Sequence, residues 1–402
     1  MKKILFGITS LTLGGAERVL VDLANELSKK EEYEITIFTI YGNGELAKQI
    51  SPKVKIETIY QKQYNELSKI QRKVIAPLQI LLTKNKIYKK YIKNKYDKEI
   101  AFLEGPITRI LACGKEKNNK IAWIHNDISK VFGTGIKATL KKYLDSKIYE
   151  KFNKLIFVSK NNLESFTKVY KNNIEKKVIY NYIDSERVLK KADEYKPEDL
   201  KKVDEYKSEE LKKTDKYKSE ELKKADEYNP EELKNQRINL VTVARLVPQK
   251  AIDRLIKVHS KLINDGVKHN LYVIGEGPEK NKLEEMIKQE QCENTVKLLG
   301  AKENPYPYMK FADYICLFSE FEGYGMVLEE AKILNKKILI TETAAKEAIE
   351  NYSKGQVFEN SEEGIYKGIK TVIQKENSKE NDTQGTNLYN NKNIIKKIEE
   401  LF

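Results

Sequence analysis

Cysteine, histidine and tryptophan are scarce in this chain of 402 residues, which contains three cysteines, three histidines and one tryptophan. The cysteines, at positions 113, 292 and 316, lie far apart and form no CxxC pair. This spacing argues against a disulfide framework and a structural zinc site, both of which need cysteines or histidines at suitable intervals. We therefore expect a reducing, cytoplasmic setting for the chain.

Long hydrophobic runs are also missing. No segment approaches the roughly 20 uninterrupted apolar residues that span a bilayer as a helix, so any membrane contact is expected to be peripheral. The apolar run near the amino terminus is short and is broken by Thr9 and Ser10. It leads into a helical pattern instead of a cleavage site, which favours a first β-strand over a signal peptide.

Positive charge is abundant and unevenly placed. The formal net charge is +14, and residues 69–98 contain ten lysines and arginines against one acidic residue, Asp97. Apolar residues and tyrosines interleave with these cations, and Pro77 kinks or divides the segment. One interpretation is a surface that rests on anionic lipid headgroups at the inner face of the membrane; the other is a helix pair with a solvated lysine face. No nucleic-acid recognition motif accompanies the charge, so no nucleic-acid partner is expected.

Short apolar runs alternate with helical patterns along the chain. Its length suits two domains, and each half shows the strand–helix alternation of a doubly wound parallel sheet. A helix over 16–29 has one apolar face, as packing on such a sheet requires. The strands predicted in the first half cover 3–9, 34–40, 99–103, 120–124, 154–158 and 177–180; in the second half, strands over 238–244, 270–275, 314–318 and 337–341 alternate with helices near 250–265, after 278 and near 325–334.

An internal repeat of eleven residues separates the two halves. Its four copies, from KKADEYKPEDL at Lys190 to KKADEYNPEEL at Lys223, contain 12 lysines and 15 acidic residues. Eleven residues are close to three helical turns, which predicts a charged helix or helical hairpin with a tyrosine and leucine stripe. A tandem expansion within a tolerant linker is the plainer interpretation.

The segment SEFEGYGMVLEEA is the strongest local signal for chemistry. Glu322 and Glu330 stand eight positions apart at a strand-to-helix junction that contains Gly323, Tyr324 and Gly325. Glycine lets a backbone approach a ligand closely, and the first turn of the helix offers N–H groups to a diphosphate. We expect Glu322 to bind sugar hydroxyls and Glu330 to accept from ribose hydroxyls. The alternative is a surface helix with an acidic residue favoured by the helix dipole.

Two cations occur about seventy residues earlier, in ARLVPQK. Arg245 and Lys250 follow a predicted strand, and open α/β sheets bind ligands at the carboxyl ends of their strands. Fixed cations there neutralise the charge that builds on a diphosphate leaving group. Because a lone pair of this kind is usually only solvated, the prediction depends on its combination with Glu322.

Seven segments carry a family resemblance through their order and spacing: LGGAERVLVDLA, IAFLEGP, AWIHND, VIYNYID, VARLVPQK, VIGEGPEKNKLE and NPYPYMKFADYICLFSEFEGYGMVLEEA. They are similar to segments of glycosyltransferase family 4, a group of retaining enzymes. The resemblance covers nearly the whole chain outside the repeat. It implies an α/β fold of the GT-B type, with two doubly wound Rossmann-like domains facing each other across a cleft. The repeat is foreign to the family pattern, and its spacing predicts a charged helical insertion between the two domains. The expected parts are an acceptor-side domain over 1–186, a linker over 187–236, a donor-binding domain over 237–385 and a C-terminal helix over 386–402 that packs back on the first domain.

The resemblance also implies roles for individual residues. Gly14 and Gly15 form a glycine loop that faces the cleft, and His125 lies beside the donor sugar at the reaction centre. An ordinary tight turn and a core histidine are the alternatives for these positions. The remaining matches are Arg245 and Lys250 at the donor diphosphate, Glu322 at the sugar next to Gly323, Tyr324 and Gly325, Glu330 at the ribose, and Gly275 and Gly277 at a turn near the nucleobase. Two positions depart from the pattern: Ala251 and Asn335 stand where glycine is common.

The expected activity is that of a retaining hexosyltransferase. Such an enzyme moves a sugar from a nucleotide sugar, expected to be UDP-linked, to a carbohydrate or lipid-linked acceptor in the synthesis of a surface polysaccharide or glycolipid. No cofactor beyond this donor substrate is expected, and no metal, because no DxD-type signature stands at a suitable place. The alternatives are a non-catalytic GT-B-shaped protein that binds nucleotide sugars or glycans, and an epimerase or phosphorylase on the same fold.

Overall fold

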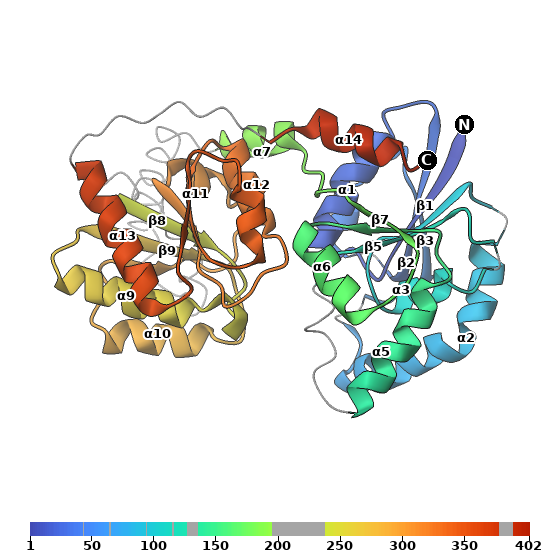
Figure 1. Cartoon of the computed structure of the whole chain (residues 1–402), viewed down its shortest axis with the longest axis horizontal. Helices are drawn as coiled ribbons and strands as arrows, with labels where there is room; N and C mark the ends of the chain where they lie inside the picture. The colour runs from blue at the N-terminus through green and yellow to red at the C-terminus, as the bar shows by residue number, and fades with distance from the viewer. Residues whose placement is uncertain are drawn as a thin grey trace, which may run out of the picture. The chain divides into compact units, whose positions relative to one another are not determined.

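The computed structural model describes residues 1–42, 44–63, 66–93, 95–114, 116–126, 136–194, 238–377 and 389–402. These residues form two compact units, Met1–Asp184 with Asn390–Phe402, and Ser185–Tyr389. Each unit contains one parallel β-sheet with helices packed on it (Figure 1). Most of the eleven-residue repeat, with the helix predicted for it, lies outside the described residues.

The first unit has a seven-stranded sheet with the strand order β3-β2-β1-β4-β5-β6-β7, and all neighbouring strands are parallel. The order reverses between β1 and β4, which makes this pair the topological switch point of a doubly wound sheet. The strands are β1 Lys2–Ile8, β2 Tyr33–Tyr41, β3 Lys55–Tyr60, β4 Lys98–Ala101, β5 Lys120–Ile124, β6 Lys154–Phe157 and β7 Glu175–Val178; the helices are α1 Gly15–Leu27, the 3-10 turn η1 Glu45–Gln49, the π-helical turn η3 Gln71–Ile75, α2 Ala76–Tyr91, α3 Pro106–Leu111, α5 Ile136–Tyr149, α6 Lys160–Val169 and α14 Asn391–Glu399.

Helices cover the central strands of this sheet on both faces. Helices α2, α3, α5 and α6 contribute to the hydrophobic cluster on one face. The apolar stripe predicted for α1 is buried at all five of its positions, because it packs on the sheet: Val19, Leu20, Leu23, Ala24 and Leu27.

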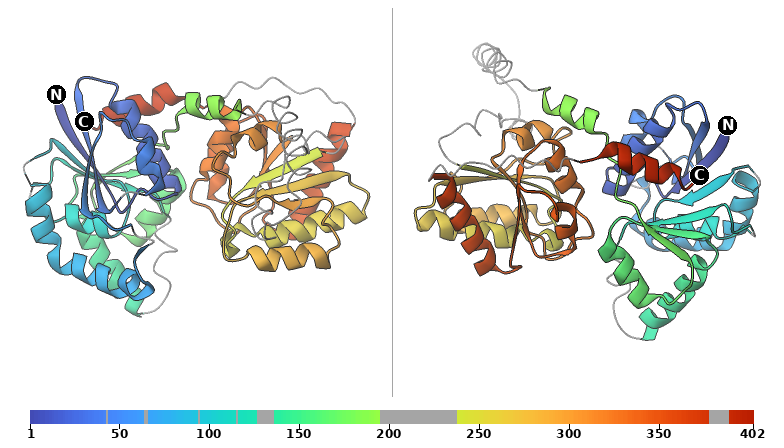
Figure 2. Two further views of the ribbon diagram at one scale, coloured as in Figure 1. Left: turned by 180° about the vertical axis from the view of Figure 1, so that it is seen from behind. Right: turned by 45° about the horizontal axis from the view of Figure 1, so that its top comes forward.

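The C-terminal helix α14 belongs to the first unit, although almost four hundred residues separate it from β1. The ring of Phe402 lies 6.4 Å from that of Phe6 and 5.6 Å from that of Tyr33, measured between centroids. An ion pair between Lys30 and Glu399 adds to this contact. Both views of Figure 2 show α14 beside α1 and the amino terminus. The helix begins at Asn391, five residues after the start expected from the sequence.

The second unit has a six-stranded parallel sheet with the order β10-β9-β8-β11-β12-β13. Its switch point is the pair β8 and β11. Helix α7, which covers the first residues of the expected linker, packs on α11 and α12 of this unit. The strands are β8 Ile238–Val243, β9 His269–Ile274, β10 Val296–Leu298, β11 Tyr314–Leu317, β12 Lys337–Thr341 and β13 Gly355–Phe358; the helices are α7 Ser185–Ala192, the 3-10 turn η5 Pro248–Lys250, α9 Ile252–Asn264, α10 Lys280–Gln289, α11 Tyr306–Phe311, α12 Met326–Ile333, the 3-10 turn η6 Ala344–Ile349 and α13 Glu362–Asn377.

The edge strands correct the sequence-based prediction. Strands β3, β10 and β13 were not predicted, and the strand expected over 177–180 is β7, which begins two residues earlier at Glu175. All four lie at a sheet edge. Edge strands are partly exposed, so their sequences mix polar with apolar residues and lack the continuous apolar run of a buried parallel strand.

Candidate active site

The carboxyl ends of β8 and β11 carry the predicted donor-site residues of the second unit. The two strands are hydrogen-bonded neighbours at the switch point. Arg245 and Lys250 follow β8, and Glu322 follows β11. In doubly wound folds this is the place where ligands bind. The order of strands in the sheet therefore brings together two loops that are about seventy residues apart in the sequence.

The side chains of Lys250 and Glu322 form an ion pair. They are 16% and 8% exposed, and Glu322 also accepts a 2.5 Å hydrogen bond from Ser319 Oγ. The loops are further joined through Gln249, whose Nε2 donates to the carbonyl oxygen of Phe321 at 3.0 Å and whose own carbonyl oxygen accepts from the backbone N–H of Glu320 at 2.9 Å. A cation and a carboxylate are thus held at one place in fixed orientation.

Arg245 differs from Lys250 in its surroundings, because its side chain is exposed. A second arginine, Arg254 on α9, was not predicted for this region. Its guanidinium donates to the carbonyl oxygen of Phe318 and to Asn360 Oδ1, each at 2.7 Å, and lies 3.2 Å from Glu320. Arg254 therefore fixes the start of the loop that carries Glu322. Its position four residues after Lys250, one helical turn away, is the signal in the sequence that points to it.

Gly275 and Gly277 allow two loops to meet. A Cβ atom on Gly275 would lie 1.9 Å from the carbonyl oxygen of Ala244, and one on Gly277 would lie 2.2 Å from that of Leu246. The backbone N–H of Leu246 donates to Glu276 across the same contact at 2.9 Å. These glycines thus permit the loop after β9 to pack on the loop that presents Arg245.

The segment from Gly323 to Glu330 forms the junction into α12. Gly325, with φ of 80°, precedes the first residue of the helix in a conformation that favours glycine. Tyr324 is buried and donates to Glu329 in the same segment. Glu330 is partly exposed and accepts a 2.9 Å hydrogen bond from the hydroxyl of Tyr306.

The two departures from the family pattern both occur where the backbone is left-handed. Ala251 has φ of 47° and Asn335 has φ of 54°. Glycine adopts this conformation freely, whereas a Cβ atom makes it costly and asparagine tolerates it better than most residues. The backbone geometry that glycine would serve is thus retained at both positions.

In the first unit, His125 lies at the carboxyl end of β5. Its ring packs against Phe102, with 4.8 Å between centroids, and its carbonyl oxygen accepts from Asn162 Nδ2 at 3.1 Å. Burial lowers the pKa of His125 to about 3, so the imidazole is neutral near pH 7. Its Nε2 atom is buried and has no hydrogen-bond partner among the described residues. The residue is therefore a neutral imidazole at a strand end.

Glu104 holds the His125 loop and was not predicted as a site residue. Its Oε1 accepts from the backbone N–H groups of His125 and Asn126, each at 2.7 Å, and its Oε2 accepts from Asn126 Nδ2 at 3.0 Å. Glu104 follows β4, the neighbour of β5, and burial raises its pKa. The Glu104 carboxylate thus holds together the loops that follow β4 and β5. Its signal in the sequence is an acidic residue directly after a buried strand, next to glycine and proline.

Gly14 and Gly15 lie at the start of α1, after β1. Gly14 has an extended backbone and is the residue before the helix, and Gly15 is the first helical residue. A Cβ atom on Gly14 would meet the carboxylate of Glu17, a flexible side chain. The internal packing of this unit therefore does not by itself demand glycine at position 14.

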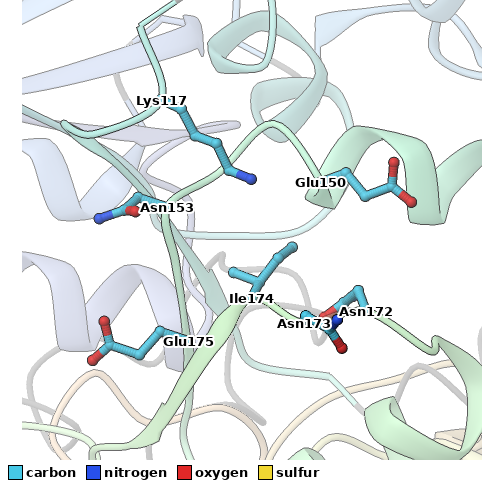
Figure 3. A pocket seen from close by; sticks show the side chains of 7 residues that line it. All are labelled: Lys117, Glu150, Asn153, Asn172, Asn173, Ile174 and Glu175. Carbon is cyan, nitrogen blue, oxygen red and sulfur yellow. The ribbon is translucent and has the colours of Figure 1, made fainter.

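A pocket of about 560 Å³ in the first unit lies away from these residues. Its lining residues, drawn in Figure 3, lie at the amino ends of β5, β6 and β7. His125 follows the carboxyl end of β5, so the pocket is at the opposite end of these strands. None of the predicted site residues lines it. Its lining residues are Lys117, Glu150, Asn153, Asn172, Asn173, Ile174 and Glu175.

Two kinds of feature, a metal-binding cluster and a membrane-spanning helix, are absent from the described residues. No group of three or more histidine, cysteine, aspartate or glutamate side chains there is arranged to hold a metal ion. No described helix combines the length and the apolar character that crossing a bilayer requires.

Comparison with known proteins gives consistent matches. Residues 224–389 match the family model described as glycosyl transferases group 1. Over 383 residues, the chain is 26% identical to the N-acetylgalactosamine-N,N'-diacetylbacillosaminyl-diphospho-undecaprenol 4-alpha-N-acetylgalactosaminyltransferase of Campylobacter jejuni, covering 93% of this chain and 91% of the relative.

Among solved structures, the fold is similar to that of Anabaena Alr3699/HepE in complex with UDP and glucose, with a TM-score of 0.67, 17% identity and coverage of 100% and 99% of the two chains. It is also similar to WaaG, a glycosyltransferase involved in lipopolysaccharide biosynthesis, with a TM-score of 0.63, 16% identity and coverage of 92% and 90%. At these identities the structural likeness shows the fold alone.

Proposed function

The chain belongs to the group 1 glycosyl transferases and has the GT-B fold, and from this premise we propose that it transfers a hexose from a UDP-sugar to a lipid-linked or carbohydrate acceptor with retention of configuration. The observation that carries the proposal is the Lys250–Glu322 pair at the carboxyl ends of β8 and β11. A cation for a diphosphate and a carboxylate for sugar hydroxyls are together what a nucleotide-sugar donor requires.

The donor half of the reaction uses fixed charges. Lys250 and Arg245 stabilise the diphosphate as the bond to the sugar breaks, because charge builds on the leaving oxygen in the transition state. Glu322 accepts from sugar hydroxyls and Glu330 from the ribose. His125, neutral near pH 7, contacts the donor sugar as a hydrogen-bonding group and not as a cation.

We propose that the acceptor hydroxyl attacks the anomeric carbon from the face that the leaving group occupies, so that the anomeric configuration is retained. The residues that the structure describes offer no evident nucleophile for a covalent intermediate. In this mechanism the departing phosphate oxygen takes the proton of the acceptor hydroxyl, while that hydroxyl oxygen bonds to the anomeric carbon. This mechanism uses no metal ion, so we expect EDTA to leave the rate of sugar transfer unchanged.

The Campylobacter relative supports a lipid-linked acceptor, because its name describes transfer to a sugar carried on diphospho-undecaprenol. The Anabaena structure, whose ligands are UDP and glucose, supports a UDP-linked donor. We propose the same classes of donor and acceptor here, in the synthesis of a surface polysaccharide or glycolipid.

Peripheral contact with an anionic membrane fits such an acceptor. The turn η3, the residue before it and helix α2 expose six large aliphatic residues, each between 46% and 74% exposed, and α2 and the residues just after it expose lysines. Pro77 lies in the first turn of α2, where the backbone has just changed from π-helical to α-helical geometry. The apolar side chains are proposed to enter the headgroup layer and the lysines to bind anionic lipid. The aliphatic set is Ile70, Val74, Ile75, Leu78, Leu81 and Leu82, and the exposed lysines are Lys86, Lys89, Lys90, Lys93 and Lys95.

Co-sedimentation with vesicles tests this surface. The double variant Leu78→Ser/Leu82→Ser is expected to lose most binding to phosphatidylglycerol vesicles, and Val357→Ser, at an exposed aliphatic residue of β13, to keep it. Equal binding to neutral phosphatidylcholine vesicles, or unchanged binding of the double variant, would contradict the proposal.

The first test of the function is thermal stabilisation by UDP-, GDP- and ADP-sugars, followed by transfer of labelled sugar to an undecaprenyl-diphosphate-linked acceptor. UDP-sugars are expected to raise the melting temperature of the wild type and of Lys261→Ala, a control at an exposed lysine of the same unit. Lys250→Ala and Glu322→Ala are expected to lose the shift. Binding of a nucleotide sugar without sugar transfer, donor hydrolysis or epimer formation would favour a non-catalytic binding protein. Failure to bind any of the nucleotide sugars would refute the proposed donor site.

A further inference from the structure

Three side chains from three helices of the second unit form a continuous polar chain that ends at Glu330. Arg187 on α7 donates from Nη1 to the hydroxyl oxygen of Tyr306 on α11 at 3.1 Å. That hydroxyl donates in turn to Glu330 Oε1 on α12 at 2.9 Å. The sequence had assigned Arg187 to a linker, whereas the structure packs α7 on both of the other helices.

The direction of these hydrogen bonds is fixed by chemistry. A guanidinium only donates, so the Tyr306 oxygen must accept from Arg187. Burial and the Glu330 carboxylate raise the pKa of Tyr306, so its hydroxyl keeps its proton and donates it to Glu330. The guanidinium also lies 5.6 Å from the centroid of the Tyr306 ring. One oxygen of Glu330 is therefore held by a phenol that an arginine orients.

The positions of Arg187 and Tyr306 are themselves secured. Asn304 Nδ2 donates to the carbonyl oxygen of Lys191 and to Glu194 Oε2, each at 2.8 Å, which ties the end of α7 to the loop before α11. Asn304 Oδ1 accepts from the backbone N–H of Tyr306 at 3.2 Å. Tyr306 is 5% exposed, whereas Arg187 and Glu330 are partly exposed, so the phenol that contacts the Glu330 carboxylate is the buried member of the three.

We propose that Arg187 and Tyr306 are positioning residues that orient Glu330 toward a ribose hydroxyl of the nucleoside diphosphate and so give the site its preference for ribonucleotides over deoxyribonucleotides. This inference rests on the proposed function, which assigns Glu330 to the ribose. A carboxylate whose Oε1 is held by the Tyr306 hydroxyl is fixed in direction as a whole, and a ribose hydroxyl that matches this direction gains a charge-assisted hydrogen bond. A nucleotide without that hydroxyl leaves the carboxylate unmatched.

The test compares the affinities of UDP, 2′-deoxy-UDP and 3′-deoxy-UDP by isothermal titration calorimetry. The wild type is expected to bind UDP at least about tenfold more tightly than one of the two deoxy analogues, the range of a hydrogen bond to a charged group. Tyr306→Phe, Arg187→Met and Glu330→Gln are each expected to bring this ratio close to one. A loss confined to folding would lower affinity for all three ligands and leave the ratio unchanged.

Tyr314→Phe is the matched control. Tyr314 is also buried, at 3% exposure, and its hydroxyl also donates to a glutamate, Glu376, but it stands at the amino end of β11. This variant is expected to keep the wild-type ratio. If Tyr306→Phe and Arg187→Met keep it too, the inference is overturned while the donor site stands. If the wild type binds no UDP, GDP or ADP, the proposed function fails and the inference with it.

Discussion

Lys250 and Glu322 form an ion pair across the loops that follow the neighbouring strands β8 and β11. Both side chains are mostly removed from water, and Ser319 completes the contact with the carboxylate. Loss of either partner leaves the other buried without its counter-charge. The pair is therefore expected to contribute to the stability of the fold as well as to donor binding.

Lys250→Met is expected to destabilise the protein by about 3 kcal/mol, because it leaves the Glu322 carboxylate buried without its counter-charge. The double variant Lys250→Met/Glu322→Gln is expected to be more stable than Lys250→Met alone, since no charge is then left unpaired. Urea denaturation of the wild type, both single variants and the double variant measures this coupling. Strict additivity of the two single effects would show that the pair contributes nothing.

Ala251→Gly is expected to stabilise the protein by about 1 kcal/mol, because it removes a Cβ atom from a left-handed backbone position. The matched control, Ala24→Gly in the middle of α1, is expected to lower stability, since that alanine has helical geometry and is fully buried. Thermal unfolding without ligand measures both. A destabilised Ala251→Gly variant would contradict the strain at this position.

Gly275→Ala is expected to destabilise strongly, by roughly 2–4 kcal/mol, because the new Cβ atom would overlap the carbonyl oxygen of Ala244. Gly266 also has positive φ, at 80°, but a Cβ atom there meets nothing within 4 Å. Gly266→Ala therefore carries the backbone cost without the clash. Equal losses in chemical denaturation of the two variants would show that φ, and not the close approach of the loops, requires glycine at 275.

Glu104→Ala is expected to lower kcat at least about tenfold with little change in the KM for the donor, because it frees the loop that positions His125. Glu104→Gln can still accept hydrogen bonds from both backbone N–H groups through its amide oxygen and is expected to recover most of kcat. A purely structural role would instead lower the melting temperature of both variants and leave kcat per folded molecule unchanged.

Glu99 makes stability depend on pH. It is buried, accepts from the Tyr88 hydroxyl at 3.0 Å, and has its pKa raised by burial from 4.5 to about 7. Between these values the folded state binds more protons than the unfolded state, so this contribution is present below about pH 4.5 and is lost as pH rises through about 7.

The variant Glu99→Gln is expected to flatten the fall in unfolding free energy between about pH 5 and about pH 8. The control Glu293→Gln, at an exposed site, is expected to keep the wild-type slope. Urea denaturation at a series of pH values measures the slope, and a slope unchanged by Glu99→Gln would contradict the assignment.

The central strands were predictable because their burial away from water is evident in their sequences as apolar runs. Strands β5 and β12 match their predicted bounds, β1 and β2 differ by one residue at each end, and β11 ends one residue earlier than predicted. These strands are covered on both faces, so they need continuous apolar runs. The edge strands β3, β10 and β13 escaped prediction because partial exposure permits the charged and polar residues that break such runs.

The candidate site was predictable where short spacing places residues after a strand. The amino acids in ARLVPQK and SEFEGYG directly follow β8 and β11, and a doubly wound sheet puts those strand ends side by side. Local sequence therefore determined which residues meet at the candidate donor site.

Only the tertiary structure decided which side chains hold the candidate residues within each unit. Glu104 contacts the His125 loop from a neighbouring strand end, and Arg187 reaches Glu330 through Tyr306 across three helices. Such contacts join residues far apart in the chain, and no local periodicity encodes them, because they depend on which helices pack together. The sequence by itself determined the central strands of the two sheets and the charged groups at their carboxyl ends; packing decided how those groups are held.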